Sequence, residues 1–286
     1  MTDKQRFPKQ PRFIQIESII GCDAQCPFCP QRDIDRTPRR MPDETWKKII
    51  DDTRGLGITY RPFLQNEALI DSRLPEIVAY IKQDATAQAE INTNGNALTE
   101  KNAAALIDAG IDTVRFSIDA FSAETYEKDR VGLDYDRVVE NIERFARMAR
   151  ESEKTITTEV RMIDMESNRH EQHDYIEYWS KRVDMTLIVP LYNWPWTEGV
   201  EMVSKPCIKM REEMFFYTDG RAVLCCWDIA GRAVIGNVNE ESVLDIWNGA
   251  RRLEYAEYLA RGEREKIELC SRCDAYAGRS FEGFED

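Results

Sequence analysis

Short apolar runs alternate with amphipathic segments along the first two thirds of the chain. The apolar runs are typical of buried strands, and we expect strands over residues 13–19, 59–64, 89–93, 112–118, 156–163 and 185–191. Between them the apolar positions recur at helical spacing, which predicts helices over residues 44–54, 74–81, 99–109, 135–148 and 172–182. Asp43 is expected to cap the first of these helices and Gly110 to end the third.

The order of these elements predicts the architecture. Six strands fall between residues 13 and 191, so each repeat takes about 30 residues, the length of a βα unit. The expected fold class is α/β, with a partial (β/α)6 barrel similar to a TIM barrel. Active sites of such barrels lie at the carboxyl ends of the strands. Cys22 comes directly after the first strand, where a catalytic loop is expected.

A different pattern follows the last of these strands. Two strand-like runs within residues 215–224 are joined by Asp219-Gly220, a dipeptide that favours a tight hairpin, and a helix is expected over residues 243–259. We therefore expect two units, the partial barrel over residues 1–195 and a small extension of hairpin and helix over residues 196–286. The aromatic-rich segment 192–196 at their junction could line a sugar-binding wall or pack the units together.

Composition narrows the functional classes. The chain has 286 residues, with 39 Lys and Arg against 52 Asp and Glu, a formal net charge of −13. A basic face that neutralises phosphates is not expected, which argues against a nucleic-acid binder. No run approaches the roughly 18 apolar residues that span a bilayer, and the first ten residues contain no apolar signal segment. We expect a cytoplasmic protein with no membrane or nucleic-acid partner.

Eight cysteines are too few for a disulfide scaffold in a chain of this length, but they are clustered. Thiolates spaced two or three residues apart converge on one metal centre because a single loop can point them inward. Soft sulfur ligands select zinc or iron–sulfur clusters. The three groups are Cys22, Cys26 and Cys29; Cys207, Cys225 and Cys226; and Cys270 with Cys273.

The first group has the spacing Cys22-x3-Cys26-x2-Cys29. Three thiolates leave one iron of a four-iron, four-sulfur (4Fe–4S) cluster open to bind a substrate or cofactor. A glutaredoxin-type dithiol of Cys26 and Cys29 would leave Cys22 without a role, and it is typical of chains of roughly a hundred residues. A structural zinc would need a fourth ligand, yet no further cysteine is near and the only histidines are His170 and His173.

The C-x3-C-x-Φ-C pattern, with Phe28 as the aromatic residue, resembles the signature of the radical S-adenosylmethionine (radical SAM) superfamily. The expected barrel is also the fold that this superfamily uses. The resemblance implies that the open iron binds the amino and carboxylate groups of SAM. One electron from the reduced cluster then cleaves SAM to a 5′-deoxyadenosyl radical, which takes a hydrogen atom from the substrate.

Four further segments at strand ends resemble SAM-binding segments of this superfamily. Residues 64–67 are similar to a Gly-Gly-Glu segment that contacts the SAM amino group, with only Glu67 retained. Residues 93–95 resemble a common Thr-Asn-Gly turn, and residues 117–119 resemble a ribose-binding segment. Arg130 resembles the arginine that often meets the SAM carboxylate.

Some of these matches have a simpler interpretation. Asn94 and Gly95 could form only a turn, and Asp119 could be only a helix cap. Four matches at consecutive strand ends nevertheless support one another. The resemblance implies this cofactor-binding set: Phe28, Gln65, Asn66, Glu67, Asn94, Ser117, Asp119 and Arg130.

The C-terminal cysteines match a second pattern of the same superfamily. Gly220 is followed by four residues and then Cys225, which resembles the signature of the SPASM and Twitch extensions. A full SPASM extension needs further cysteines for a second auxiliary cluster, and none follows Cys273. The resemblance therefore implies the shorter Twitch form with one auxiliary 4Fe–4S cluster, while a structural zinc on the same thiolates is the alternative. The implied ligands are Cys207, Cys225, Cys270 and Cys273.

Cys226 is the one thiol that neither cluster would use. In sulfatase-maturing relatives the residue after the corresponding ligand is an acidic general base that faces the substrate. The resemblance thus implies that Cys226 points into the active cavity, where a thiol can donate a hydrogen atom to a substrate radical. The alternative is a small buried packing residue, because free cysteines are often buried.

The resemblance implies hydrogen abstraction from a carbinol carbon of a sugar, cyclitol or aminoglycoside-like small molecule, and an acidic pocket would suit amino groups. Hydrogen return from Cys226 would give epimerisation. Electron transfer to the auxiliary cluster, with Asp228, Glu159 or Asp119 as the base, would give dehydrogenation. The alternatives are radical modification of a ribosomal peptide and two non-enzyme functions, an iron–sulfur electron carrier or a zinc-stapled interaction protein.

Two sets of charged residues complete the predictions. Glu159 and Arg161 on the expected fifth strand either face the barrel interior or pair with each other. A basic stretch directly after the first cysteines could dock an acidic flavodoxin or ferredoxin-type reductant, or it could be only a solvated loop. This stretch contains Arg32, Arg36, Arg39 and Arg40.

Overall fold

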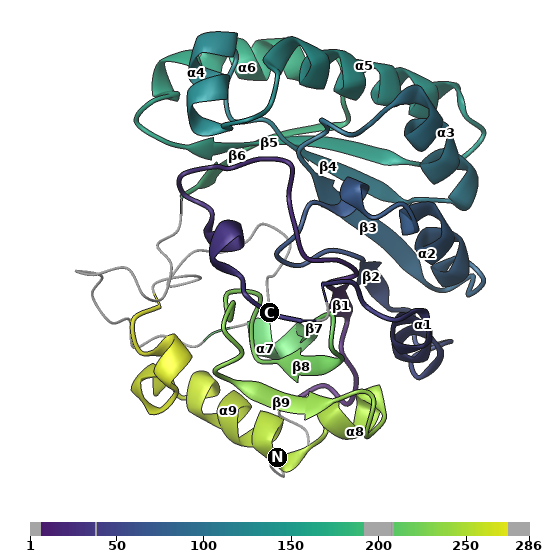
Figure 1. The fold of residues 1–286 in the computed structure, drawn as a ribbon, viewed down its shortest axis with the longest axis vertical. Helices are drawn as coiled ribbons and strands as arrows, with labels where there is room; N and C mark the ends of the chain where they lie inside the picture. Colours follow the sequence, from purple (N-terminus) through teal and green to yellow (C-terminus); the bar gives the residue numbers. More distant parts are fainter. Residues whose placement is uncertain (1–6, 38, 192–206, 208, 274–286) are drawn as a thin grey trace.

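The computed structural model describes residues 7–37, 39–191, 207 and 209–273. These residues form one nine-stranded sheet in the order β6-β5-β4-β3-β2-β1-β7-β8-β9 (Figure 1). The six predicted strands are present and parallel to their neighbours, and among the described residues the sheet is not closed, as expected of a partial barrel. They are β1 (Phe13–Ile16), β2 (Thr59–Arg61), β3 (Gln88–Thr93), β4 (Thr113–Ser117), β5 (Thr157–Asp164) and β6 (Met185–Pro190).

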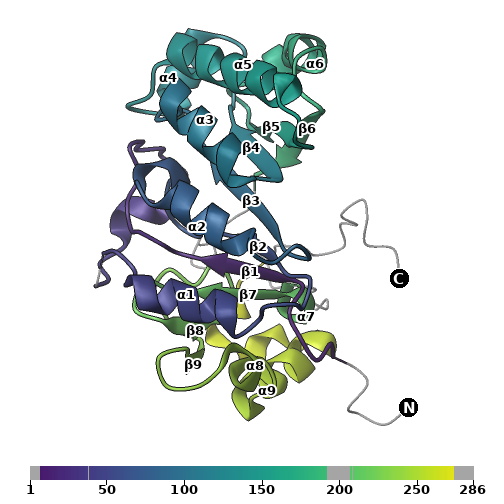
Figure 2. The same ribbon diagram turned by 90° about the vertical axis from the view of Figure 1, so that its right-hand side faces the viewer.

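Helices lie on the outer face of these six strands, as Figures 1 and 2 show from two directions. The α-helices are α1 (Asp43–Asp51), α2 (Leu74–Ile81), α3 (Glu100–Ala109), α4 (Ala123–Asp129), α5 (Tyr135–Glu151) and α6 (Gln172–Trp179). Short 3-10 helices stand at η2 (Pro30–Asp33), η3 (Ala68–Ile70), η4 (Arg169–Glu171), η5 (Arg264–Lys266) and η6 (Glu268–Cys270).

The predicted helix ends are confirmed in one case and wrong in another. Gly110 ends α3 in a left-handed conformation, with a φ of 88° that favours glycine. Asp43 does not cap α1, because the helix begins at Asp43 itself and Pro42 takes the cap position. The Asp43 carboxylate instead accepts hydrogen bonds from the Trp46 indole and the Arg73 guanidinium. Helix α4 was not predicted.

Helix α5 shows how the outer helices hold the strands. Val138, Ile142, Phe145 and Ala149 recur at helical spacing and are buried against the sheet. The ring of Phe145 meets that of Phe116 in β4 edge to face, with centroids 5.7 Å apart. This contact fixes the carboxyl end of β4 against α5.

The C-terminal extension adds three strands to the same sheet. The predicted hairpin is confirmed: β7 and β8 pair in antiparallel fashion, and Gly220 in the turn has a φ of 84°. Two features were not predicted, namely a third strand and the parallel pairing of β7 with β1. The elements are α7 (Lys209–Glu212), β7 (Glu213–Phe216), β8 (Arg221–Val223), β9 (Val234–Asn237), α8 (Val243–Trp247) and α9 (Ala250–Ala260).

The single helix predicted over residues 243–259 is wrong, because α8 and α9 are separate. Gly249 between them has an extended backbone and takes the N-cap position of α9. A Cβ atom at Gly249 would lie 3.1 Å from the carbonyl oxygens of Asp245 and Ile246. The close approach of the α8 backbone therefore favours glycine at this break.

Two predicted features of the junction between the barrel and the extension lie in residues that the structure does not describe. The expected boundary between residues 195 and 196, and the aromatic segment 192–196, lie outside the described residues. No helix in the described part of the chain has the length and apolar character needed to cross a membrane.

Candidate functional site

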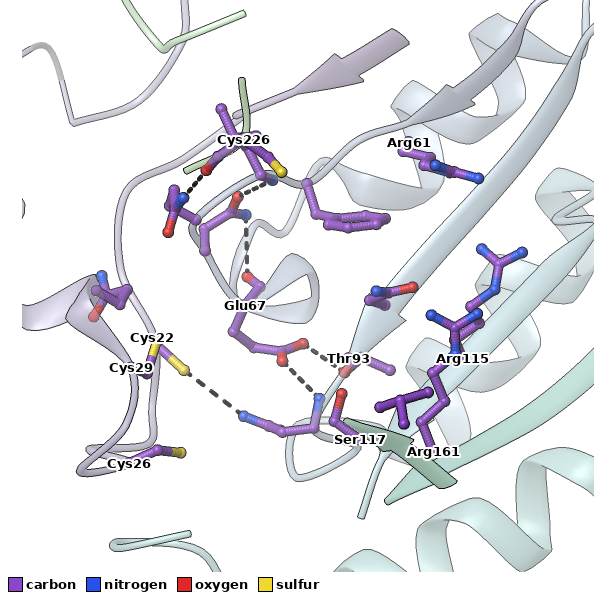
Figure 3. A pocket seen from close by; sticks show the side chains of 18 of the residues that line it. Cys22, Cys26, Cys29, Arg61, Glu67, Thr93, Arg115, Ser117, Arg161 and Cys226 are labelled. Atoms are coloured by element: carbon purple, nitrogen blue, oxygen red, sulfur yellow. Dashed lines mark hydrogen bonds between the residues drawn. The ribbon is translucent and has the colours of Figure 1, made fainter. Parts of the chain in front are cut away.

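The main cavity has a volume of about 1070 Å³ and lies on the inner side of the sheet. The cysteine loop (residues 22–29), the segments after β2 and β3, the end of β4 and the start of the extension all contribute to its wall (Figure 3). It brings together most of the residues that were predicted to bind the cluster, SAM or substrate. These are Cys22, Cys26, Phe28, Cys29, Gln65, Asn66, Glu67, Asn94, Ser117, Arg130 and Cys226.

The cysteine loop presents its three thiols to the main cavity. A turn in which the Cys29 amide donates to the Cys26 carbonyl, 3.0 Å away, brings these two residues to the same side of the loop. The Asn94 side chain lies 3.9 Å from the Cys22 sulfur. Burial raises the pKa of all three thiols, to about 12 for Cys22. The charge of a bound metal is therefore needed to hold them as thiolates at neutral pH.

Glu67 fixes the segment after β2 to the end of β3. Its carboxylate accepts hydrogen bonds from the Leu69 amide at 3.0 Å, from the Asn94 amide at 2.7 Å and from the Thr93 hydroxyl. Burial raises the pKa of Glu67 to about 7, although these three donors oppose the shift. These hydrogen bonds fix the segment that contains Gln65 and Asn66, and both residues line the cavity. The contact predicted between Glu67 and the SAM amino group stays a prediction.

Arg130 and Asp119 form a buried pair beside the cysteine loop. The Arg130 Nε donates to Asp119 Oδ2 at 2.6 Å, and Asp119 Oδ1 accepts from the Ile163 amide at 2.7 Å. Asp119 is fully buried and is not among the residues that line the main cavity. The ribose contact predicted for Asp119 stays a prediction, and Ser117 of the same segment does line the cavity. Arg130 lies over the ring of Phe28, 5.5 Å from its centroid.

The auxiliary cavity is smaller and lies within the extension. All four thiols predicted to hold the second cluster line it, namely Cys207, Cys225, Cys270 and Cys273. Lys209 and Arg264 also line it, and the Arg264 guanidinium donates to the Cys273 carbonyl at 2.9 Å. A 4Fe–4S cluster on four thiolates carries negative charge, which these two cations would offset. The donor set and its electrostatics therefore fit the predicted cluster.

The spacing of the thiols bears on the zinc alternative. Across residues 7–37, 39–191, 207 and 209–273, no three or more His, Cys, Asp or Glu side chains are close enough to hold a single metal ion. The four thiols of the extension instead surround a cavity. A tetrahedral zinc ion would need all four sulfur atoms about 2.3 Å from one point.

Cys226 and its neighbour Cys225 line different cavities. Cys225 lines the auxiliary cavity and Cys226 lines the main one, and the two thiols are close enough to interact with each other. The Gln65 side chain donates a hydrogen bond to the Cys226 carbonyl (Figure 3). Lys209 and Trp227 line both cavities and form part of the wall between them. Cys226 therefore has the position that a hydrogen donor needs, while donation itself stays a prediction.

A belt of alternating charges crosses the inner face of the sheet, and we call it the charged belt. Only Glu159 and Arg161 were singled out from the sequence, and they are indeed paired. The other members come from separate segments, so only their inward-facing strand positions could have indicated them. In order, the belt is Lys209, Glu213, Arg61, Glu90, Arg115, Glu159 and Arg161.

The main cavity is not acidic, although the chain as a whole is. Six cationic and four acidic side chains line it. Asp228, a candidate base, does not line it: it is buried, and its carboxylate accepts from the amides of Arg232 and Ala233, both at 2.8 Å. The net charge of −13 belongs to the whole chain and does not describe its interior.

Arg36 belongs to the basic stretch that could dock a reductant or form a solvated loop, and its burial contradicts both alternatives for this residue. It is 8% exposed and forms a bidentate pair with Glu17, at 2.6 and 2.9 Å. Its guanidinium also donates to the Ile229 carbonyl and lies 3.6 Å from the centroid of the Tyr217 ring. The buried carboxylate and ring draw Arg36 inward, so that it ties the segment after the cysteine loop to the extension. Exposed residues of the same stretch are Arg32, Arg39 and Arg40.

Most of the chain matches two known protein families. Residues 16–173 match the radical SAM superfamily, and residues 207–274 match SPASM, an iron–sulfur cluster-binding domain. A probable GTP 3′,8-cyclase of Methanococcus maripaludis is 29% identical over 143 residues, which is 49% of this chain and 48% of that protein. The PqqA peptide cyclase of Granulibacter bethesdensis is 29% identical over 119 residues, 41% of this chain and 32% of that protein. The chain thus spans half or less of these relatives.

Solved structures share the fold over nearly the whole chain. BtrN in complex with AdoMet and 2-DOIA superposes with a TM-score of 0.66 at 18% identity, over 93% of both chains. Streptococcus suis SuiB bound to S-adenosylmethionine gives a TM-score of 0.70 at 12% identity, over 94% of this chain and 74% of that one. From the family match and the two cysteine-lined cavities we conclude that the chain belongs to the radical SAM superfamily, with a SAM-binding 4Fe–4S cluster and an auxiliary cluster in a C-terminal SPASM extension.

Proposed function

We propose that this enzyme abstracts a hydrogen atom from a carbinol carbon of a sugar- or cyclitol-like small molecule, the class that also includes aminoglycosides. The polar side chains of the main cavity support a hydroxylated substrate, among them Gln15, Gln31, Asn92 and Ser117. The likeness of the fold to BtrN, a structure determined with AdoMet and 2-DOIA, is consistent with a small-molecule substrate.

The position of Cys226 is the observation that carries the proposal. It is the one cysteine outside both ligand sets, and it lines the cavity that the cysteine loop also lines. When bound at that loop, SAM supplies the radical that removes the hydrogen atom. Cys226 then donates a hydrogen atom from its sulfur to the substrate carbon, and the resulting thiyl radical returns to the thiol by taking one electron from the flavodoxin or ferredoxin-type reductant and one proton from solvent. Donation to the face opposite to abstraction inverts that carbon, so the outcome is epimerisation.

Dehydrogenation is the second outcome that the site can support. The substrate radical would then lose one electron to the auxiliary cluster and its hydroxyl proton to a base, for which Glu159 lines the main cavity, and would become a ketone, while Cys226 would only pack against its neighbours. The observation in favour is that Lys209 and Trp227 line both cavities, which places the auxiliary cavity directly behind the wall of the main one.

A peptide substrate is the other candidate. SuiB, in its structure bound to the precursor peptide SuiA, superposes with a TM-score of 0.69 over 94% of this chain and 72% of that one. Competition between peptides and small molecules for stimulation of 5′-deoxyadenosine release would separate these classes.

The test uses a panel of sugars, cyclitols and aminoglycosides with anaerobically reconstituted enzyme. A substrate is identified by release of 5′-deoxyadenosine above the uncoupled rate, and turnover is then repeated in deuterated water. Epimerisation places one deuterium at the inverted carbon, because the thiol of Cys226 exchanges with solvent. Cys226→Ala still releases 5′-deoxyadenosine but gives no inverted product, and Cys226→Ser, which keeps the size of the side chain, behaves in the same way. A ketone that both variants still form would establish dehydrogenation instead.

A further inference from the structure

The charged belt carries more positive than negative charge. It holds four cations and three carboxylates, and a cation stands at each end, Lys209 at one and Arg161 at the other. Arg115 and Arg61 lower the pKa of Glu90, one of these carboxylates, even though burial opposes the shift. The belt therefore brings an unbalanced positive charge to the inside of a strongly acidic protein.

The arginines of the belt face the main cavity across from the cysteine loop. Figure 3 shows Arg61, Arg115 and Arg161 one below another on one side, with the three cysteines on the other side. Arg61 and Arg115 each lie between two carboxylates, and their side chains are 16% and 15% exposed. Arg161 is 36% exposed, and within the described residues its only ion-pair partner is Glu159.

Glu159 does not neutralise Arg161 fully, because it is shared. Its other oxygen accepts from the Arg115 Nε at 3.2 Å, so one carboxylate serves two guanidinium groups. A guanidinium presents five donors in a planar fork that matches the oxygens of a phosphate or carboxylate. Arg161 therefore has donors available for an anionic group in the cavity.

We propose that the substrate carries a phosphate or a carboxylate, which binds to Arg161 at the end of the charged belt. This inference rests on the proposed function, because it names the group that anchors the hydroxylated molecule. An anion held at Arg161 leaves the remainder of the molecule within the cavity, toward the cysteine loop and Cys226. The belt thus selects acidic or phosphorylated sugars and cyclitols over neutral and amino-substituted ones.

Three of the four carboxylates that line the cavity are poor partners for an amino group. Glu159 and Glu213 each contact two cations, and the Glu67 carboxylate already accepts from three donors. Glu212 lies 3.8 Å from the Arg12 guanidinium. An ammonium group in this cavity would also meet the unbalanced charge of the belt, so we expect amino sugars to bind more weakly than acidic ones.

The test measures binding without turnover. Anaerobically reconstituted enzyme with SAM bound is titrated calorimetrically with four probes: glucose, glucosamine, glucose 6-phosphate and glucuronate. We expect at least one anionic probe to bind about tenfold or more tightly than glucose, as one charge-assisted bidentate contact allows, and glucosamine to bind no better than glucose. The phosphate and carboxylate arms show which anion the site prefers.

Three variants locate the effect. Arg161→Gln should remove the preference for the anionic probe while the iron content stays that of the wild type, and Arg161→Lys should retain part of the preference, because the charge remains while the planar fork is lost. Arg169→Gln is the matched control, since Arg169 is 63% exposed and pairs with Asp164 away from the main cavity. It should bind all four probes as the wild type does.

The proposal is overturned if glucosamine is the tightest probe, or if the anionic preference survives Arg161→Gln. It is equally overturned if neither anionic probe shows saturable binding below about 10 mM, a Kd that corresponds to only about 2.7 kcal/mol of binding free energy. The test is independent of the carbinol chemistry. Cys226→Ala should keep the anionic preference in full, so a failure of the proposed function would leave this result standing.

Discussion

The two sets of cysteines differ in the number of thiols and in what surrounds them. The cysteine loop offers three thiols beside a cavity of about 1070 Å³ lined by polar side chains. The extension offers four thiols around a small cavity lined by residues such as Leu224, Leu259 and Leu269. A cluster with three protein ligands beside a large cavity can bind a small molecule at its fourth iron. A cluster with four protein ligands in a small cavity cannot. Ligand number and access together separate the two roles.

The two regions are nevertheless one structure. Strand β7 of the extension pairs with β1, and the cysteine loop begins shortly after β1 ends. Arg36 reinforces this link through Glu17 on one side and Tyr217 with Ile229 on the other. Variants of one cysteine set can therefore be compared with variants of the other, because both sets belong to the same sheet.

The largest effect is expected from removal of the open site. A variant with Cys22, Cys26 and Cys29 all changed to Ala should keep about half of roughly eight irons and eight sulfides and lose SAM cleavage entirely, because only the extension still holds a 4Fe–4S cluster. Iron and sulfide assays and chromatography of 5′-deoxyadenosine measure both quantities. Cys270→Ala is the counterpart, and it should lose iron from the extension while uncoupled SAM cleavage continues. Zinc in the extension of the triple variant would contradict this assignment.

The next effect concerns the link between the regions. Arg36→Met should lower the free energy of unfolding by about 3 kcal/mol or more, because it leaves the fully buried Glu17 carboxylate without its partner. Arg32→Met is the control in the same segment, since Arg32 is 64% exposed and its loss should change stability little. Denaturation of the two variants in parallel measures the difference. Equal stabilities would show that Arg36 does not join the extension to the cysteine loop.

A smaller, pH-dependent effect is expected at the open site. Burial raises the pKa of Glu67 from 4.5 to about 7. Its contribution to stability is therefore complete below about pH 4.5 and is lost as the pH rises through 7, amounting to about 3 kcal/mol at most. Relative to Glu67→Gln, which does not titrate, the wild type should become less stable between pH 5 and pH 8. Melting temperatures of both proteins across this range give the difference, and parallel pH profiles would show that Glu67 ionises normally.

Much of this site could be predicted because its signals are local. Cys22, Cys26 and Cys29 lie in one short segment, so their spacing alone indicates a metal centre. The strand runs and the Asp219-Gly220 turn are also local patterns, and they determine which residues reach the carboxyl ends of the strands. For this reason the ligand sets and the partial barrel followed from the sequence.

The rest depends on contacts between distant segments. The burial of Arg36 requires Glu17 and Tyr217 to surround it, and nothing in its own basic segment indicates this. The charged belt likewise joins Glu213 to Arg61 across the sheet, which is possible only because β7 takes its place beside β1. The net charge of the whole chain gives no indication of this arrangement, because the cations of the belt are brought together only by the fold.

The central claim is that the site with three thiols binds SAM and the site with four does not. Electron paramagnetic resonance of the dithionite-reduced enzyme, recorded with and without SAM, tests it most directly. The wild type should show one component that changes on addition of SAM and one that does not. The Cys22/Cys26/Cys29→Ala variant should keep only the unchanged component. A signal that still responds to SAM in this variant would contradict the claim, because the responding cluster would then lie in the extension.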